Sequence, residues 1–250
     1  YQAHYTVIGK FVFHHLWFLY DLIWLIAAFV IVASVFQAFE LRQLSSWLVG
    51  FPFCLVWLLP LTYYAQIHMD DFGPATAVFI KPHWWKLFYY AIFFGFGALC
   101  FSTSDFSDLL RRIWPACIVF AIPALLYGLE YHEQRGKGEN YRNMASLCAV
   151  TYAWLTIFGF IGFSRQFFSG KNKIIRYISD SSYWLYLAHL PLIQVVQIWV
   201  SDWKYPHYLK LTFICIVTTG VLLLIYEFMI RYTWVGTMLN GKRTREPADG

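Results

Sequence analysis

Residues 183–200 read YWLYLAHLPLIQVVQIWV, an almost wholly apolar segment that nevertheless contains His189 and Pro191. A helix that crosses the hydrocarbon core of a bilayer needs about 20 mostly apolar residues. In lipid such a segment must satisfy its own backbone hydrogen bonds, which favours a helix. The segment therefore predicts a membrane-spanning helix with an ionisable ring at a depth where burial is costly.

The composition of the whole chain also indicates a membrane protein. Of its 250 residues, 59% are hydrophobic and 13% are charged, whereas about a quarter are charged in soluble proteins. The 12 Trp and 18 Tyr residues suit the depth of the lipid headgroups. The net charge of +5 lies between apolar segments and in the C-terminal tail, so we expect the lipid bilayer as a partner and no nucleic acid.

Seven apolar segments are predicted to span the membrane, and no series of short alternating strands indicates a barrel. The sequence therefore predicts an all-α, polytopic transmembrane helix bundle over residues 1–238, followed by a polar cytoplasmic tail over residues 239–250. The predicted spans are 16–36, 47–66, 85–101, 113–130, 144–163, 183–200 and 209–230.

The distribution of Lys and Arg between the two sides predicts the orientation, because cytoplasmic loops carry the excess. The side that holds residue 1 carries eight: Lys10, Lys81, Lys86, Arg135, Lys137, Arg142, Lys204 and Lys210. The opposite side carries eleven: Arg42, Arg111, Arg112, Arg165, Lys171, Lys173, Arg176, Arg231, Lys242, Arg243 and Arg245. We therefore expect a cytoplasmic C-terminus and an outside N-terminus. The chain starts at Tyr1 without a signal segment, so we also expect an odd number of further spans upstream.

Polar residues in the first span are candidates for function because ionisable groups are costly in a membrane. His15 and Trp17 lie at its outer end, and Asp21 lies one to two turns further in. The alternative for the histidine is anchoring at the interface. A carboxylate at the depth of Asp21 needs a charged partner, protonation or a water-filled cavity.

A second polar group lies in the sixth span. Ser182, Tyr186 and His189 are spaced by four and three residues, so they share one helix face. This pattern indicates a polar stripe that faces a cavity, with His189 as a proton carrier or a hydrogen-bond partner of a substrate. The alternative is a histidine that ties two helices together.

Glu227 and Arg231 form a third group at the cytoplasmic end of the seventh span. They are four residues apart, with the acid before the base, which is the favourable order for an ion pair on one helix face. A helix-end ion pair and a substrate contact both remain open.

The small residues of the spans are interpreted as packing residues. Each of the five cysteines lies in or at the end of an apolar segment without metal-type Cys/His spacing, so no metal site is expected. Gly95 and Gly97 are expected to let two helices approach closely.

Four stretches together carry a resemblance to a known family: HHLWFLYDLI (14–23), KLFYYAIFFGFGALCF (86–101), YISDSSYWLYLAHLPLI (177–193) and LIYEFMIRYTWVGTMLNGK (224–242). The chain resembles the C-terminal two-thirds of a bacterial membrane protein of acyltransferase family 3. It is most similar to the glucans biosynthesis protein C branch, which adds succinyl groups to periplasmic glucans. The resemblance implies a bundle of about ten helices, of which the seven spans here are the last.

The resemblance also implies the reaction. An acyl group, succinyl or acetyl, passes from cytoplasmic acyl-CoA to a hydroxyl of a periplasmic glucan or other envelope carbohydrate, at the bacterial inner membrane and without a bound cofactor. The family hallmark is an Arg, ten residues and a His, the presumed catalytic base, on the first helix. No Arg or Lys of this chain is followed by a His eleven positions later, so we expect the base to lie upstream.

The resemblance gives the candidate residues supporting roles in the acyl-transfer cavity. His189 and Tyr186 would line it, and His15 with Trp17 would shape its outer mouth. The substrate contacts would be Asp21, Ser182, Glu227 and Arg231. The contacts to the phosphates of CoA would be Lys171, Lys173 and Arg176. For the three cytoplasmic cations the alternative is orientation charge alone.

Two other functions remain open on the sequence. A polar stripe beside a proline-containing helix also suits a transporter or flippase for an envelope saccharide, although the chain shows no inverted repeat. A non-catalytic membrane subunit is the other alternative.

Overall fold

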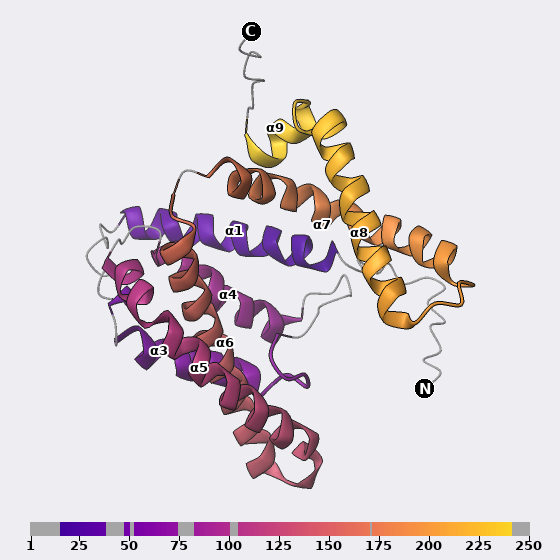
Figure 1. Ribbon diagram of the computed structural model, residues 1–250. Coiled ribbons are helices and arrows are strands. Elements are labelled where there is room, and N and C mark those ends of the chain that lie inside the picture. Colours follow the sequence, from indigo (N-terminus) through magenta and orange to yellow (C-terminus); the bar gives the residue numbers. More distant parts are fainter. Residues whose placement is uncertain are drawn as a thin grey trace. The chain divides into compact units, whose positions relative to one another are not determined.

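The computed structural model describes residues 16–38, 48–50, 53–74, 83–100, 105–170 and 172–241. Every regular element in these ranges is a helix, which confirms the predicted all-α class. The chain divides into two compact units, Tyr1–Ser169 and Gly170–Gly250, whose elements are labelled in Figure 1.

Five helices in the described ranges are long and apolar enough to cross a membrane. They match the predicted spans 16–36, 113–130, 144–163, 183–200 and 209–230, so the protein is a multi-pass membrane protein. The other two predicted spans coincide with the shorter helices α3 (Phe53–Gln66) and α4 (Trp84–Cys100).

Unit 1 contains α1 (Trp17–Ala38), α3, α4, α5 (Asp105–Glu133), the 3₁₀ turn η2 (Arg135–Lys137) and α6 (Glu139–Phe167). Helices α5 and α6 form an antiparallel hairpin, α3 packs on α4 and α6, and α1 packs on α4. Both hairpin helices are longer than the predicted spans 113–130 and 144–163, because the polar residues that flank each span are helical as well.

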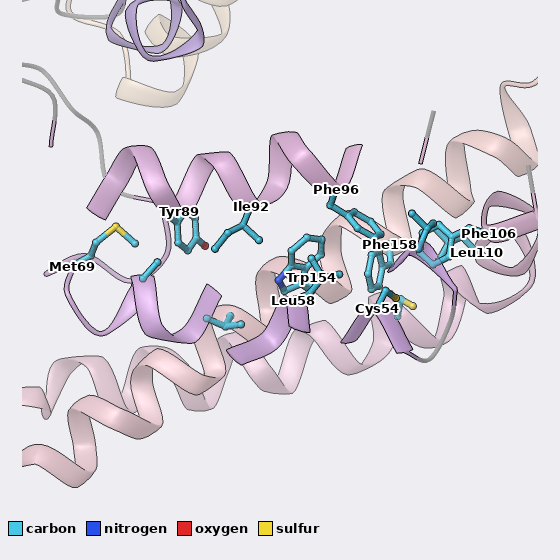
Figure 2. Close-up of a cluster of buried hydrophobic side chains, with 14 residues drawn as sticks. Cys54, Leu58, Met69, Tyr89, Ile92, Phe96, Phe106, Leu110, Trp154 and Phe158 are labelled. Atoms are coloured by element: carbon cyan, nitrogen blue, oxygen red, sulfur yellow. The ribbon is translucent and has the colours of Figure 1, made fainter. Parts of the chain in front are cut away.

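The core of unit 1 is an aromatic cluster around Trp154 of α6 (Figure 2). Its indole ring stacks on Phe93 of α4, with ring centroids 4.5 Å apart, and meets Phe96 edge-to-face at 5.3 Å. The indole N–H donates to the hydroxyl of Thr62 in α3 at 3.1 Å. One side chain therefore ties α3 and α4 to α6 and leaves its own polar atom satisfied.

Close approach of α5 and α6 depends on glycines in α6. A Cβ at Gly162 would overlap the backbone carbonyl of Leu110, and one at Gly159 would come within 2.5 Å of Ile118. The sequence interpretation chose Gly95 and Gly97 for this role. A Cβ at either of those positions meets nothing within 4 Å, so that expectation is wrong.

Unit 2 is a second hairpin, formed by α7 (Lys173–Val200) and α8 (His207–Ile225). Helix α8 continues into a π-helical turn, η3 (Tyr226–Ile230), and the chain then forms the short helix α9 (Trp234–Asn240). The Asn172 side chain caps α7 by accepting from the N–H groups of Ile174 and Ile175. Helix α7 therefore begins ten residues before the predicted span.

Large apolar side chains remain exposed along the spanning helices, among them Ile23, Val30, Ile31, Val119 and Ile198. A soluble protein rarely exposes apolar surface of this extent. The same side chains are compatible with lipid tails, which are as apolar as they are.

Replacing Gly162 with Ala should loosen the α5–α6 hairpin. The added methyl group must displace the Leu110 carbonyl, so we expect a loss of about 1–3 kcal/mol, partly offset by the higher helix propensity of Ala. Thermal unfolding in detergent, followed by circular dichroism, measures this. Gly97→Ala is the matched control and should be neutral or stabilising. Equal melting temperatures for the two variants would contradict the packing role of Gly162.

Candidate functional site

Asp21 is the only charged side chain among the buried residues of the described ranges, and it is 3% exposed. It lies on α1 where that helix packs against α4. Lys86, at the start of α4, brings a positive charge near the Asp21 carboxylate. The carboxylate is also near enough to Tyr90 of α4 to interact with it electrostatically. The ring of Trp17 lies 5.7 Å from that of Tyr90. Of the three ways in which a carboxylate at this depth was expected to be accommodated, a charged partner is thus the one to which Lys86 contributes.

One polar atom of this α1–α4 cluster, Oδ2 of Asp21, is buried without a hydrogen-bond partner among the described residues. A buried polar atom without a partner costs about 1–3 kcal/mol. The cluster therefore suits a further polar group, such as a substrate hydroxyl or carbonyl.

Sequence reasoning found Trp17 and Asp21 but missed Lys86 and Tyr90. These two residues are four positions apart and therefore lie on one face of α4, which is the pattern that could have revealed them. His15 precedes the cluster in the chain and lies outside the described residues.

The polar stripe of α7 is partly as predicted. Tyr186 and His189 are both half-buried, with ring centroids 6.0 Å apart. Ser182 is exposed, and its hydroxyl donates to the Ser179 carbonyl at 2.6 Å. The buried serine is its neighbour Ser181, whose hydroxyl donates to the Ile178 carbonyl at 3.0 Å.

The imidazole of His189 is held by its own helix. Its Nδ1 lies 2.7 Å from the carbonyl oxygen of Tyr186 and 3.1 Å from that of Leu185. A carbonyl oxygen only accepts hydrogen bonds, so Nδ1 carries the proton. In the neutral ring Nε2 is therefore the basic nitrogen, and its orientation is set by the bonds of Nδ1.

The ion pair between Glu227 and Arg231 forms as the spacing suggested, with Nη1 2.8 Å from Oε2 and 3.0 Å from Oε1. The guanidinium carbon also lies 5.1 Å above the ring of Tyr177 and 5.3 Å from that of Tyr232. Burial alone would lower the pKa of Arg231, but the hydrogen bonds and charge of Glu227 raise it overall. Because this cluster joins α7 to η3 and each charge has its partner inside it, the geometry favours a structural role.

Helix α9 is tied to the same region. The amide of Asn240 donates to the Asp180 carbonyl at 2.7 Å and to the hydroxyl of Tyr226 at 3.3 Å. The C-terminal stretch of the family resemblance is therefore packed against α7 rather than separate from it.

Lys173 and Arg176 lie exposed in the first turn of α7, beside the Asn172 cap. Lys171 lies outside the described residues. Unit 1 thus contains Trp17 and Asp21, and unit 2 contains the described candidates of α7 and η3. No group of three His, Cys, Asp or Glu side chains suited to a metal ion occurs within the described ranges.

The comparison with protein families decides the class. The family model for acyltransferase family 3, described as an acyltransferase domain, matches residues 2–227. The chain belongs to acyltransferase family 3. This family membership confirms a membrane acyltransferase in general terms. No curated protein and no solved structure matches the chain.

Arg231→Ala should weaken the tie between α7 and η3. The substitution leaves the half-buried Glu227 carboxylate without its cation, and we expect a loss of about 1 kcal/mol because the pair is partly exposed. Chemical unfolding in detergent measures this. Arg176→Ala removes an exposed cation of the same unit and should leave stability unchanged. A stability of Arg231→Ala equal to that of Arg176→Ala would argue against the structural role.

Proposed function

We propose that this family 3 acyltransferase moves an acyl group, succinyl or acetyl, from cytoplasmic acyl-CoA to a hydroxyl of a glucan or other envelope carbohydrate outside the inner membrane. The family match over residues 2–227 carries the proposal. The ionisable and polar groups inside otherwise apolar helices support it, because such groups in a membrane serve function in most proteins.

The chemistry requires a base for the hydroxyl and donors for the thioester oxygen as charge develops on it. In this proposal His189 presents Nε2 to the acceptor hydroxyl or to a group that binds it. Tyr186 packs beside the imidazole and supplies a hydroxyl. Since the hallmark base of the family has no counterpart in this chain, His189 has a supporting role.

The α1–α4 cluster is assigned to the substrate in the same proposal. Asp21 offers a buried oxygen, Oδ2, that the described residues leave without a hydrogen-bond partner. A carboxylate accepts hydrogen bonds when it is ionised and can also donate one when it is protonated. A substrate hydroxyl can pair with this oxygen in either state, because a hydroxyl both donates and accepts.

The donor side is assigned to Lys173 and Arg176, together with Lys171. A helix N-terminus carries partial positive charge and is a favourable place for phosphates. Cations in the first turn of α7 add to that charge instead of offsetting it. This arrangement suits the phosphates of CoA, and it also satisfies the positive-inside pattern.

An acyl-transfer assay tests the proposal against a transporter or a non-catalytic subunit. Intact protein in vesicles is supplied with labelled succinyl-CoA or acetyl-CoA and a glucan on the other side. Label is expected on the glucan. Movement of unmodified glucan would identify a transporter. The absence of both labelling and movement would identify a non-catalytic subunit.

His189→Ala should lower the rate of acyl transfer at least about tenfold, because the acceptor hydroxyl, or a group that binds it, loses a hydrogen-bond partner. The measurement is the initial rate of glucan labelling in protein of unchanged melting temperature. His207→Ala is the matched control, because His207 is exposed at the start of α8, and it should retain the full rate. A full rate in His189→Ala would show that this histidine has only a packing role.

Asp21→Asn keeps the shape of the buried side chain but removes its charge. We expect the acyl-transfer rate to fall at least about tenfold, because the amide replaces one carboxyl oxygen with an NH₂ group that only donates and thus disrupts the hydrogen bond with the substrate hydroxyl. The exposed Asp202→Asn serves as the control. Loss of folding without any specific loss of rate in the folded fraction would show that Asp21 serves only to join α1 and α4.

A further inference from the structure

A second polar site lies at the end of unit 1 where the α3–α4 connection meets η2. We call this the outer end, because the charge distribution predicts that it faces outside. A surface cavity of about 510 Å³ lies here, within the usual size range of small-ligand sites. His68, Arg135, Gly136, Glu139, Arg142 and Asn143 contribute to its lining.

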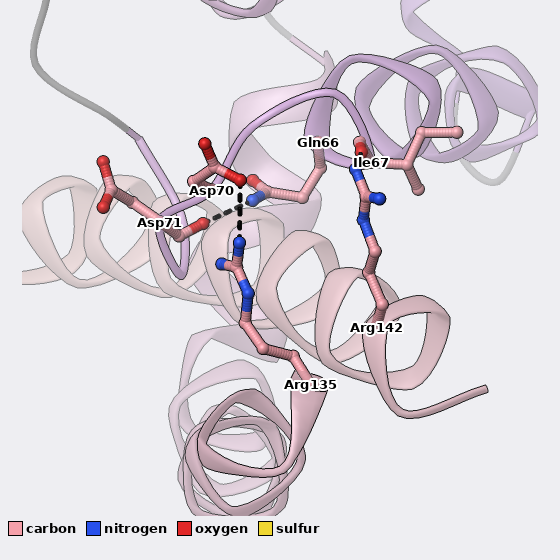
Figure 3. Close-up of polar contacts among 6 residues, drawn as sticks. All are labelled: Gln66, Ile67, Asp70, Asp71, Arg135 and Arg142. Atoms are coloured by element: carbon pink, nitrogen blue, oxygen red, sulfur yellow. Dashed lines mark hydrogen bonds and ion pairs between the residues drawn. The ribbon is translucent and has the colours of Figure 1, made fainter. Parts of the chain in front are cut away.

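The two arginines of this outer cavity are held in place by α3 and the segment that follows it (Figure 3). The guanidinium of Arg135 donates to Oδ1 of Asp70 at 2.7 Å. The guanidinium of Arg142 donates to the carbonyl oxygen of Ile67, just past the last residue of α3. A cation at a helix C-terminus is stabilised by the helix dipole, so Arg142 joins α6 to the end of α3.

The imidazole ring of His68 is also held in a fixed orientation. Its ring stacks on that of Trp85, with centroids 3.9 Å apart and planes 13° apart. Its Nδ1 lies 2.7 Å from the carbonyl oxygen of Tyr64 and therefore carries the proton. Nε2 is then a hydrogen-bond acceptor in the neutral ring.

A buried acceptor lies behind this wall. Gln66 is 2% exposed, and its Nε2 donates to the Asp71 carbonyl at 2.8 Å. Its Oε1 has no hydrogen-bond partner among the described residues. The side chain lines a small cavity that shares Arg135 and Arg142 with the outer cavity. The small cavity next to the outer cavity thus contains a buried acceptor without a partner among the described residues.

The charges of the outer cavity favour a neutral ligand. Arg135 forms an ion pair with Asp70, and the lining contains Glu139 as well as Arg142, so the formal charges of these four residues sum to zero. What remains is an alternation of donors and acceptors, the donors being the guanidinium groups and the Asn143 amide. Hydroxyl groups both donate and accept, so a hydroxyl-rich molecule complements this set.

We propose that the outer cavity binds a neutral saccharide and is the docking site of the acceptor. The identification of that saccharide as the acceptor rests on the proposed function. The predicted side of the membrane supports the assignment, because the α3–α4 connection and η2 both face outside in the predicted orientation. None of the residues of this cavity belongs to the acyl-transfer residues assigned above.

Gly136 offers a direct way to block the outer cavity. It lies in the lining, and a Cβ at this position would meet nothing within 4 Å. Gly136→Trp therefore has open space for its Cβ and places a large ring at the cavity. The matched control is Lys137→Trp, because the neighbouring Lys137 is exposed and is not part of the lining.

The test is calorimetric titration of the intact protein in nanodiscs with laminaritriose, a neutral glucose trisaccharide, and separately with inorganic phosphate. We expect laminaritriose to bind wild type and Lys137→Trp equally, and to bind Gly136→Trp at least about tenfold more weakly. Equal binding to Gly136→Trp and wild type would overturn the proposal. Binding of phosphate but not of laminaritriose would also overturn it, since the cavity would then be an anion site.

Release of free CoA thiol from acyl-CoA, measured on the same samples, separates this inference from the proposed function. Laminaritriose binding that Gly136→Trp removes, without thiol release in any variant, would contradict acyl transfer and leave the saccharide site in place. Thiol release without laminaritriose binding to wild type would support acyl transfer and overturn the saccharide site.

Discussion

The close contact between α5 and α6 is the constraint on which the described part of unit 1 depends. Lipid tails are as apolar as leucine, so helices in a membrane gain little from burying apolar surface against each other. They associate instead through close packing and polar ties. Gly162 permits the first by admitting the Leu110 carbonyl. Trp154 supplies the second by reaching Thr62 of α3.

The same constraint explains where the polar side chains lie. Most charged groups of unit 1 are at helix ends, where Arg135 and Arg142 join the outer connections of the helices. Asp21 is the exception, because it is buried within α1 and needs the charge of Lys86. An ionisable side chain inside a membrane helix is costly and usually marks a functional site, which supports a substrate role for the α1–α4 cluster.

The sequence predicted the helices well, because their length and apolar composition are local properties. It failed where a contact depends on the partner helix. Gly97 and Gly162 have similar apolar neighbours, yet only Gly162 faces a neighbouring backbone. Likewise, spacing alone assigned Ser182 to the polar face, whereas the rotation of α7 buries Ser181. The ion pair of Glu227 and Arg231 was predictable since both residues lie on one helical turn.

The depth of the outer cavity has a consequence for the reaction. Helix α6 has 29 residues, or about 44 Å at 1.5 Å per residue, whereas the hydrocarbon core is about 30 Å thick. Glu139 and Arg142 lie in its first turn, respectively five and two residues before the predicted span 144–163 begins. A saccharide bound there remains in water or among headgroups. Its hydroxyl groups exchange hydrogen bonds with water for hydrogen bonds with the polar lining, which avoids the cost of moving them into lipid. A polymeric acceptor can therefore be held at the outer cavity by one of its sugar units without the entry of that unit into the hydrocarbon core.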